Sequence, residues 1–198
     1  MMSLPGIGRL GWVGAGILAA SVLAPTMHGA QLRVRDLDDE LVDPFKAPRD
    51  TKAIVLVFVS TDCPISNRYA PALARLYERF QPQGVRFWLV YPNPMDPPEA
   101  VRRHLTEYSL PLPALRDPRQ DLVKMAGATI TPEAAVYDRE RRLLYRGRID
   151  DRYIQLGLER PAATQHDLAD ALSDVLAGKP VRQAAAPAVG CFIADFAP

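Results

Sequence analysis

Two long apolar runs dominate the hydrophobic pattern of the chain. Residues 53–59 contain no polar side chain, and residues 85–91 contain a single charged one. Runs of this length, rich in β-branched and aromatic residues, predict strands buried in a sheet. Between them, apolar residues recur at helical spacing from Tyr69 to Phe80. The pattern therefore predicts a strand, a helix that begins at Pro64, and a second strand.

Shorter periodic segments fill the second half of the chain. They predict helices at about residues 99–108, 120–125 and 164–176, a short strand at 112–115, and a β-hairpin formed by 131–138 and 143–148. The strand–helix–strand order implies right-handed crossovers between parallel strands, and the hairpin adds antiparallel ones. We therefore expect an α/β fold with a mixed central sheet and helices on both faces.

The first thirty residues differ in kind from the rest. Arg9 precedes an apolar stretch over residues 10–24, and small residues follow it. This order predicts a secretory signal peptide at residues 1–30, with an uncleaved N-terminal anchor as the alternative. The remainder divides into a domain at residues 31–180 and a Pro/Ala-rich tail at 181–198. We therefore expect a periplasmic or secreted protein that meets a membrane only through an uncleaved N-terminal segment.

Charge restricts the class of partner. The chain has 24 basic and 23 acidic side chains and a net charge of +1. A nucleic-acid partner requires a concentrated basic surface, which this balance does not provide. We therefore expect no nucleic-acid partner.

The candidate chemistry lies in the turn between the first strand and the first helix. If the helix begins at Pro64, Cys63 lies at its N-terminus, where free backbone N–H groups and the helix dipole favour an anion. The thiolate is the reactive form of cysteine, and such a position lowers the thiol pKa. Ser66 occupies the place of the second cysteine in a Cys-x-x-Cys site, so this turn alone cannot close a disulfide. The alternative is that Cys63 is a small buried hydrophobe.

The sequence holds one other cysteine, Cys191, in the predicted tail. In an oxidising compartment the two cysteines allow at most one intramolecular disulfide. Cys191 is then either a resolving thiol on a mobile segment or a structural partner of Cys63. A structural bridge would stabilise the fold by about 4–5 kcal/mol through the entropy of the loop that it closes.

Further motifs agree with a thiol site. Thr131-Pro132 precedes a predicted core strand, and an X-Pro bond there can be cis. Arg148 follows the hairpin and is a candidate to approach Cys63, where it would stabilise a thiolate and a departing oxyanion; a solvated charged loop is the alternative.

The sequence resembles the thioredoxin/peroxiredoxin superfamily in several places. They are the segment from Val55 through Cys63, the Thr131-Pro132 pair, the strand that follows, and the terminal Gly-Cys-x-Ile at 190–193. The ending is similar to the redoxin, or AhpC/TSA-like, branch.

The resemblance implies a thioredoxin-like fold in which Thr131 and Pro132 flank the Cys63 thiol. A typical peroxiredoxin carries Pro-x-x-x-Thr/Ser-x-x-Cys; Ser60 fits the hydroxyl position, whereas Leu56 stands in place of the proline. The resemblance implies an exported thiol-dependent oxidoreductase that uses a small peroxide or a protein disulfide, an external thiol reductant and no cofactor.

Two other functions stay open at this point. The first is a copper-binding module, similar to copper-delivering thioredoxin folds, which would use Cys63 with Cys191 or a carboxylate. The second is a non-catalytic binding domain with a structural Cys63–Cys191 disulfide.

Overall fold

The computed structural model describes residues 1–2, 32 and 34–195. The chain divides into two units, Met1–Gln31 and Leu32–Pro198, and every element named below belongs to the second. The predicted signal segment at residues 1–30 lies outside the described residues except for its first two. In the part of the chain that the structure covers, no helix combines the length and apolar content needed to cross a bilayer.

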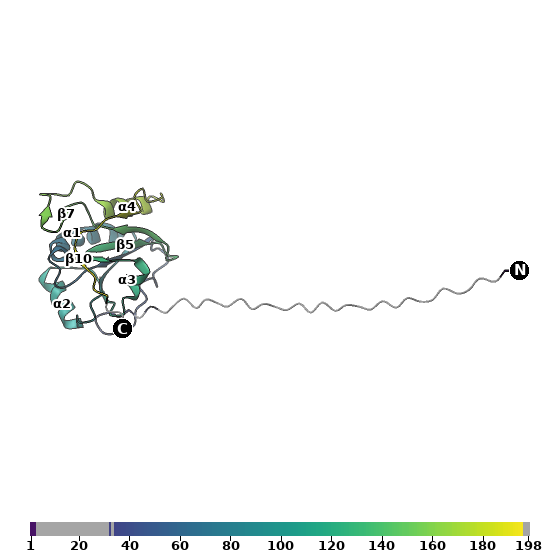
Figure 1. Cartoon of the computed structure of the whole chain (residues 1–198), viewed down its shortest axis with the longest axis horizontal. Coiled ribbons are helices and arrows are strands. Elements are labelled where there is room, and N and C mark those ends of the chain that lie inside the picture. The colour runs from purple at the N-terminus through teal and green to yellow at the C-terminus, as the bar shows by residue number, and fades with distance from the viewer. Residues whose placement is uncertain (3–31, 33, 196–198) are drawn as a thin grey trace. The chain divides into compact units, whose positions relative to one another are not determined.

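Helices and strands alternate as far as β4, as the sequence pattern predicts, and strands predominate after it (Figure 1). In chain order they are β1 (Ala53–Phe58), α1 (Pro64–Phe80), a 3-10 turn (Gln81–Gln83), β2 (Val85–Tyr91), α2 (Pro98–Glu107), β3 (Ala114–Arg116), α3 (Asp121–Ala126), β4 (Ile130–Thr131), β5 (Glu133–Tyr137), β6 (Leu143–Gly147), β7 (Tyr153–Gln155), β8 (Leu158–Glu159), α4 (Asp167–Leu176), β9 (Ala185–Ala186) and β10 (Cys191–Phe192). The α/β prediction is confirmed.

The central sheet is mixed. Its six strands lie in the order β3-β2-β1-β5-β6-β9. β1, β2 and β3 are parallel, as right-handed crossovers through α1 and α2 require. β5 runs antiparallel to both β1 and β6, so the predicted hairpin is present. The carboxyl end of β1 therefore lies in the middle of the sheet, beside the amino end of β5.

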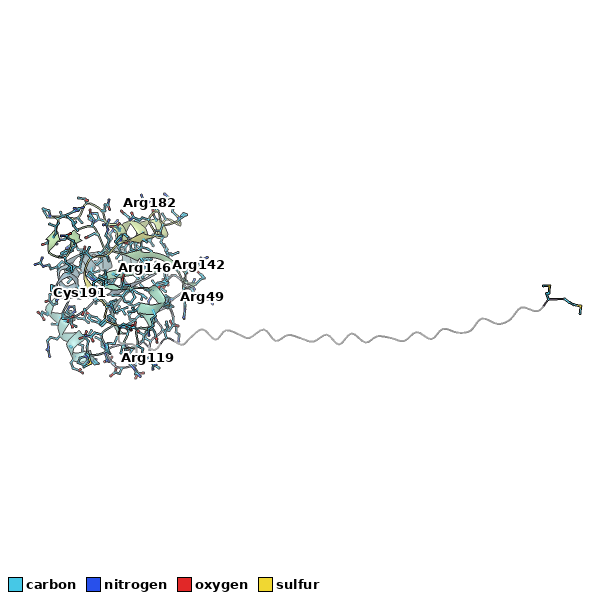
Figure 2. All side chains as sticks on the ribbon, viewed as in Figure 1. Arg49, Arg119, Arg142, Arg146, Arg182 and Cys191 are labelled. Atoms are coloured by element: carbon cyan, nitrogen blue, oxygen red, sulfur yellow. The ribbon has the colours of Figure 1, made fainter. Side chains whose placement is uncertain are left out.

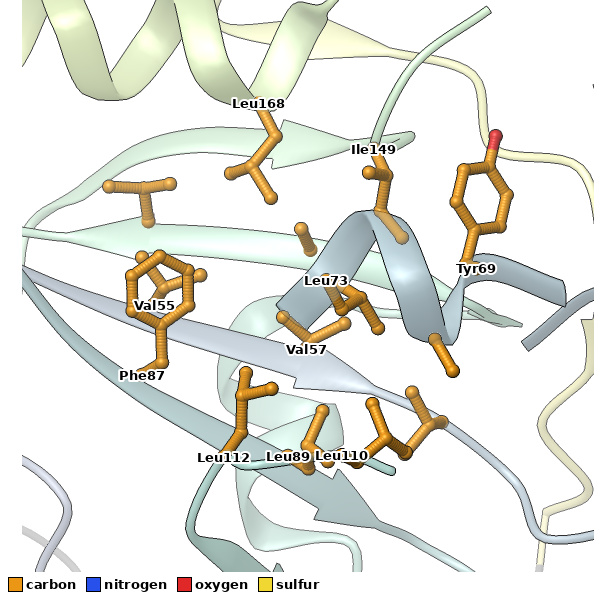
Figure 3. Packing of buried hydrophobic residues seen from close by; sticks show 14 of the residues in the cluster. Val55, Val57, Tyr69, Leu73, Phe87, Leu89, Leu110, Leu112, Ile149 and Leu168 are labelled. Carbon is orange, nitrogen blue, oxygen red and sulfur yellow. The ribbon is translucent and has the colours of Figure 1, made fainter. Parts of the chain in front are cut away.

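Every residue of β1 is buried, which explains why this strand reads as a continuous apolar run. Alternate side chains serve two cores. Val55 and Val57 face α1 and α4, whose Leu73 and Leu168 point toward them (Figure 3). The other face of β1, including Leu56, packs against α3 and the lead-in segment. Helices therefore cover both faces of the sheet, as expected.

The C-terminal segment differs from the expected irregular, mobile tail. β9 pairs with β6 in the central sheet, and β10 pairs with β4. Both strands are two residues long, so they carry no period that a sequence pattern can reveal. The small hairpin of β7 and β8 was also absent from the prediction; its pairing contains an irregular step after Tyr153.

Candidate active site

Cys63 is the N-cap residue of α1, as the sequence predicts. Its backbone is extended, and its Sγ accepts a hydrogen bond from the backbone N–H of Ser66 at 3.5 Å. Pro64 follows in the first turn, where its missing N–H costs no hydrogen bond. The sulphur therefore takes the place that a serine or aspartate oxygen occupies in an ordinary N-cap, at the positive end of the helix.

The Thr131-Pro132 segment faces this sulphur. The peptide bond between the two residues is cis, and Thr131 O accepts a hydrogen bond from the Cys63 thiol at 3.1 Å. The carboxylate of Glu133 holds the loop in place by accepting hydrogen bonds from the backbone N–H groups of Thr129 and Ile130. The structure therefore brings Thr131 and Pro132 to the reactive-thiol candidate.

Cys191 reaches the same place from the C-terminal segment. In the pairing of β10 with β4, Cys191 lies opposite Thr131. The Cys191 side chain is a hydrogen-bond partner of the Cys63 sulphur, and both cysteines are free thiols. Cys63 is 1% exposed, whereas Cys191 is only partly buried. Two thiols that are far apart in the sequence thus lie side by side.

The two thiols have pKa values shifted in opposite directions. Burial acts to raise the pKa of Cys63, but hydrogen bonding with Cys191, with Ser66 and with the side chain of Thr131 outweighs it, and the pKa lies below the ordinary 9.0. The Ser66 hydroxyl is itself buried and makes no hydrogen bond of regular geometry with any described residue. Burial and the neighbouring Cys63 raise the pKa of Cys191 to about 11. Of the two thiols, Cys63 therefore ionises first as the pH rises, and the Cys191 thiol stabilises its thiolate.

A pH titration of the reduced protein tests this assignment. As the pH rises, thiolate absorbance at 240 nm should appear first from Cys63, below pH 9.0, and then from Cys191 near pH 11. Cys191→Ala removes a hydrogen-bond donor and should raise the pKa of Cys63. Cys191→Ser keeps a donor and should raise it less. A first transition that survives Cys63→Ala would contradict the assignment.

Ser60 lies in the same turn, but its hydroxyl donates to the carboxylate of Asp62. Arg148 lies elsewhere. Its guanidinium binds the buried carboxylate of Asp167 at 2.8 Å and Gln165 at 2.5 Å, so it is held at the N-terminal end of α4. No contact in the described part of the chain joins it to Cys63. The structure brings together Cys63, Cys191, Thr131 and Pro132, with Ser60 beside them.

A buried polar network behind the turn escaped the sequence interpretation. His104, on α2, pairs through Nδ1 with the Tyr91 hydroxyl at 2.9 Å and through Nε2 with Asn67 Oδ1 at 2.8 Å. The Asn67 amide donates to the carbonyl of Thr61, in the cysteine turn, at 3.3 Å. Burial lowers the pKa of His104, which favours its neutral form. The spacing of Asn67 four residues after Cys63, on one face of α1, was the available indication.

Two cavities flank Cys191. One, of about 250 Å³, is lined by Ser60, Asp62, Thr131 and the segment that follows Cys191. The other, of about 490 Å³, lies between the start of α1 and the β7–β8 hairpin, and its lining is largely apolar. Figure 2 shows Cys191 on the opposite side of the view from Arg49 and Arg142. External molecules thus have two approaches to the Cys191 side of the thiol pair.

The chain matches the family model described as the AhpC/TSA family over residues 24–146. This chain belongs to the AhpC/TSA family. Its match spans more than half of the sequence and includes β1, the Cys63 turn and the Thr131-Pro132 loop. Membership, together with the thioredoxin-like fold, supports a thioredoxin-like redox function. No curated protein matches this AhpC/TSA member.

Solved structures agree with this membership. A hypothetical protein from Sinorhizobium meliloti is 32% identical, with a TM-score of 0.68, and the match covers 81% of this chain and 88% of that one. An uncharacterized conserved protein from Geobacillus kaustophilus is 28% identical, with a TM-score of 0.73 and coverages of 84% and 90%. A secreted Mycobacterium tuberculosis disulfide oxidoreductase is 18% identical, with a TM-score of 0.50 and coverages of 75% and 96%. The last match shows the fold alone.

Proposed function

We propose that this AhpC/TSA protein is an exported thiol-dependent oxidoreductase in which Cys63 is the reactive thiol and Cys191 the resolving thiol. The observation that carries the proposal is that both cysteines meet Thr131: the Cys63 thiol donates to Thr131 O at 3.1 Å, and Cys191 pairs with Thr131 between β10 and β4. One thiol has a lowered pKa and the other a raised one, which suits an attacking group and its proton-bearing partner.

The oxidative half of the reaction ends in the same product, a Cys63–Cys191 disulfide, with either proposed substrate class. With a peroxide, the Cys63 thiolate attacks one oxygen, the O–O bond breaks, and a sulfenic acid forms as water or an alcohol leaves. The Cys191 sulphur then displaces the hydroxyl as water. With a disulfide, the Cys63 thiolate forms a mixed disulfide, and Cys191 displaces the substrate thiol. Both routes leave a Cys63–Cys191 disulfide, which an external thiol reduces with two electrons.

Export is part of the same proposal, and two observations support it. The N-terminal thirty residues have the order of a signal segment, and two cysteines that can form one disulfide suit an oxidising compartment. The partners we propose are therefore a small peroxide or a protein disulfide, together with a thiol reductant outside the cytoplasm.

Mass spectrometry of tryptic fragments tests the proposal. Trypsin releases Cys63 in fragment 53–68 and Cys191 in fragment 183–198. We expect the two fragments to be linked after one equivalent of hydrogen peroxide or of oxidised glutathione, and separate after reduction. If the fragments never link, the resolving role of Cys191 is wrong. A link that resists a glutathione buffer would favour the non-catalytic domain with a structural disulfide instead.

A further inference from the structure

The segment that carries Cys191 lies along the Thr131 loop as a short extended strand. Besides the pairing of Cys191 with Thr131, the N–H of Ile193 donates to Thr129 O at 2.9 Å, and Gln120 Nε2 donates to Ala194 O at 2.6 Å. The Thr131 hydroxyl also donates to Cys191 O at 3.4 Å. The backbone edge beside the cis-proline is therefore already occupied by this chain.

Gly190 makes this close approach feasible. A Cβ at this position would lie 2.0 Å from Thr131 O and 2.7 Å from Thr131 C, both of them backbone atoms. Any side chain here would force β10 away from β4. The glycine of the Gly-Cys ending is thus a spatial requirement for holding the strand over the site.

Exposure differs between the two cysteines. Cys63 is 1% exposed, beneath the strand, whereas Cys191 lines both cavities described above. The next residue, Phe192, is 82% exposed. Leu156 on the β7–β8 hairpin is 63% exposed and lines the larger cavity with Cys191. A polypeptide that arrives at this surface meets Cys191 and apolar side chains, not Cys63.

We propose that β10, held in place by Gly190, closes Cys63 to polypeptides, so that a partner protein exchanges thiols with Cys191. This inference rests on the proposed function, because it concerns the disulfide that the two cysteines form. Of the two proposed substrates it selects the small peroxide, because a protein disulfide does not reach a Cys63 that is closed to polypeptides. The reductant is then a protein dithiol, and it reaches only one sulphur of the pair, that of Cys191.

The exchange balances as follows. A thiolate of the partner dithiol attacks Sγ of Cys191, the Cys63–Cys191 bond breaks, and Cys63 leaves as the thiolate. The second thiolate of the partner then attacks the partner's own sulphur in the mixed disulfide and releases Cys191, which takes up a proton. Two electrons pass from the dithiol, which becomes a disulfide, to the cysteine pair.

The chemistry of the leaving group favours the same direction. The sulphur that departs fastest in thiol–disulfide exchange is the one with the lower thiol pKa. That sulphur is Cys63, whose pKa is lowered, while the pKa of Cys191 is raised. Access and leaving-group chemistry thus both direct the attack to Cys191.

Trapping of the mixed disulfide tests the choice of sulphur. The oxidised full chain is mixed with a thioredoxin whose second active-site cysteine is serine, quenched with acid and digested with trypsin. We expect the probe on fragment 183–198 in excess over fragment 53–68 by about tenfold or more, because Cys191 is the accessible sulphur and Cys63 is the better leaving group. Equal labelling, or labelling mainly on fragment 53–68, overturns the proposal.

A second measurement tests the strand itself. In the reduced full chain, Gly190→Val should detach β10 and raise the rate at which polyethylene-glycol maleimide labels Cys63 by about tenfold or more. Ala194→Val places the same branched side chain at an exposed position of the segment that carries Cys191, and should leave that rate unchanged. A folded Gly190→Val protein that labels like the wild type overturns the proposal.

The two proposals fail in different ways. If the wild type forms no Cys63–Cys191 disulfide under any oxidant, the proposed function is wrong. The labelling comparison then still decides whether β10 covers Cys63. If Gly190→Val does not fold, the trapping experiment on the wild type decides alone.

Discussion

Replacing Cys63 by serine should abolish the proposed reaction of this protein with peroxides and disulfides. A serine hydroxyl stays protonated at neutral pH, so the nucleophile that the α1 N-terminus and the Cys191 thiol stabilise is lost. We expect a fall of at least about a thousandfold in the rate of peroxide or disulfide consumption with dithiothreitol as reductant, because the thiolate is the reacting species.

Cys191→Ser is the matched control for this prediction. It keeps Cys63 and should consume one equivalent of oxidant in a single turnover, leaving a sulfenic acid or a mixed disulfide on Cys63. Sustained turnover with a dithiol should be lost. A Cys63→Ser protein that still consumes oxidant at the wild-type rate would place the chemistry elsewhere in the chain.

Gly147→Val should destabilise the fold and disturb the thiol pair at a distance. A Cβ at Gly147 would lie 2.1 Å from Ala186 O, where β6 meets β9. β9 must then move away from β6. This movement breaks two backbone hydrogen bonds, from Arg146 N–H to Ala184 O and from Arg148 N–H to Ala186 O. We expect a loss of about 3 kcal/mol and a fall in Tm of about 10 °C, as for an overpacked core.

The rate of disulfide formation in Gly147→Val separates displacement of the Cys191 segment from a general loss of stability. Because β9 precedes the segment that carries Cys191, formation of the Cys63–Cys191 disulfide should slow well below the unfolding midpoint. Leu143→Val, at the exposed end of the same strand, should change neither quantity by a comparable amount. Wild-type stability in Gly147→Val would show that β9 contributes little to the fold.

The parts of the fold that the sequence predicts are those with a long period or a strong local chemical preference. β1 and β2 appear as apolar runs because both faces of their strands are buried. The start of α1 is predictable because Pro64 marks a first helical turn, and this alone places Cys63 at the N-cap. The thiol-site residues Thr131 and Pro132 follow from resemblance, since two residues carry no periodicity.

The remainder of the site depends on packing between distant segments. The strands β9 and β10 have two residues each, and their positions depend on glycines whose importance appears only when a Cβ is placed beside the opposite backbone. Arg148 was a candidate to approach Cys63, with a solvated charged loop as the alternative, but the buried carboxylate of Asp167 binds it. A charged side chain takes the partner that the folded chain provides, and that partner cannot be identified from the sequence around Arg148.

The N-cap role of Cys63 couples the oxidation state to the backbone of α1. A thiolate brings a negative charge to the positive end of the helix, whereas a disulfide sulphur at the same place is uncharged. The amide proton of Ser66, which is bonded to that sulphur, therefore experiences a different acceptor in each state. Its chemical shift and its exchange with solvent make it a spectroscopic indicator of oxidation that requires no added probe.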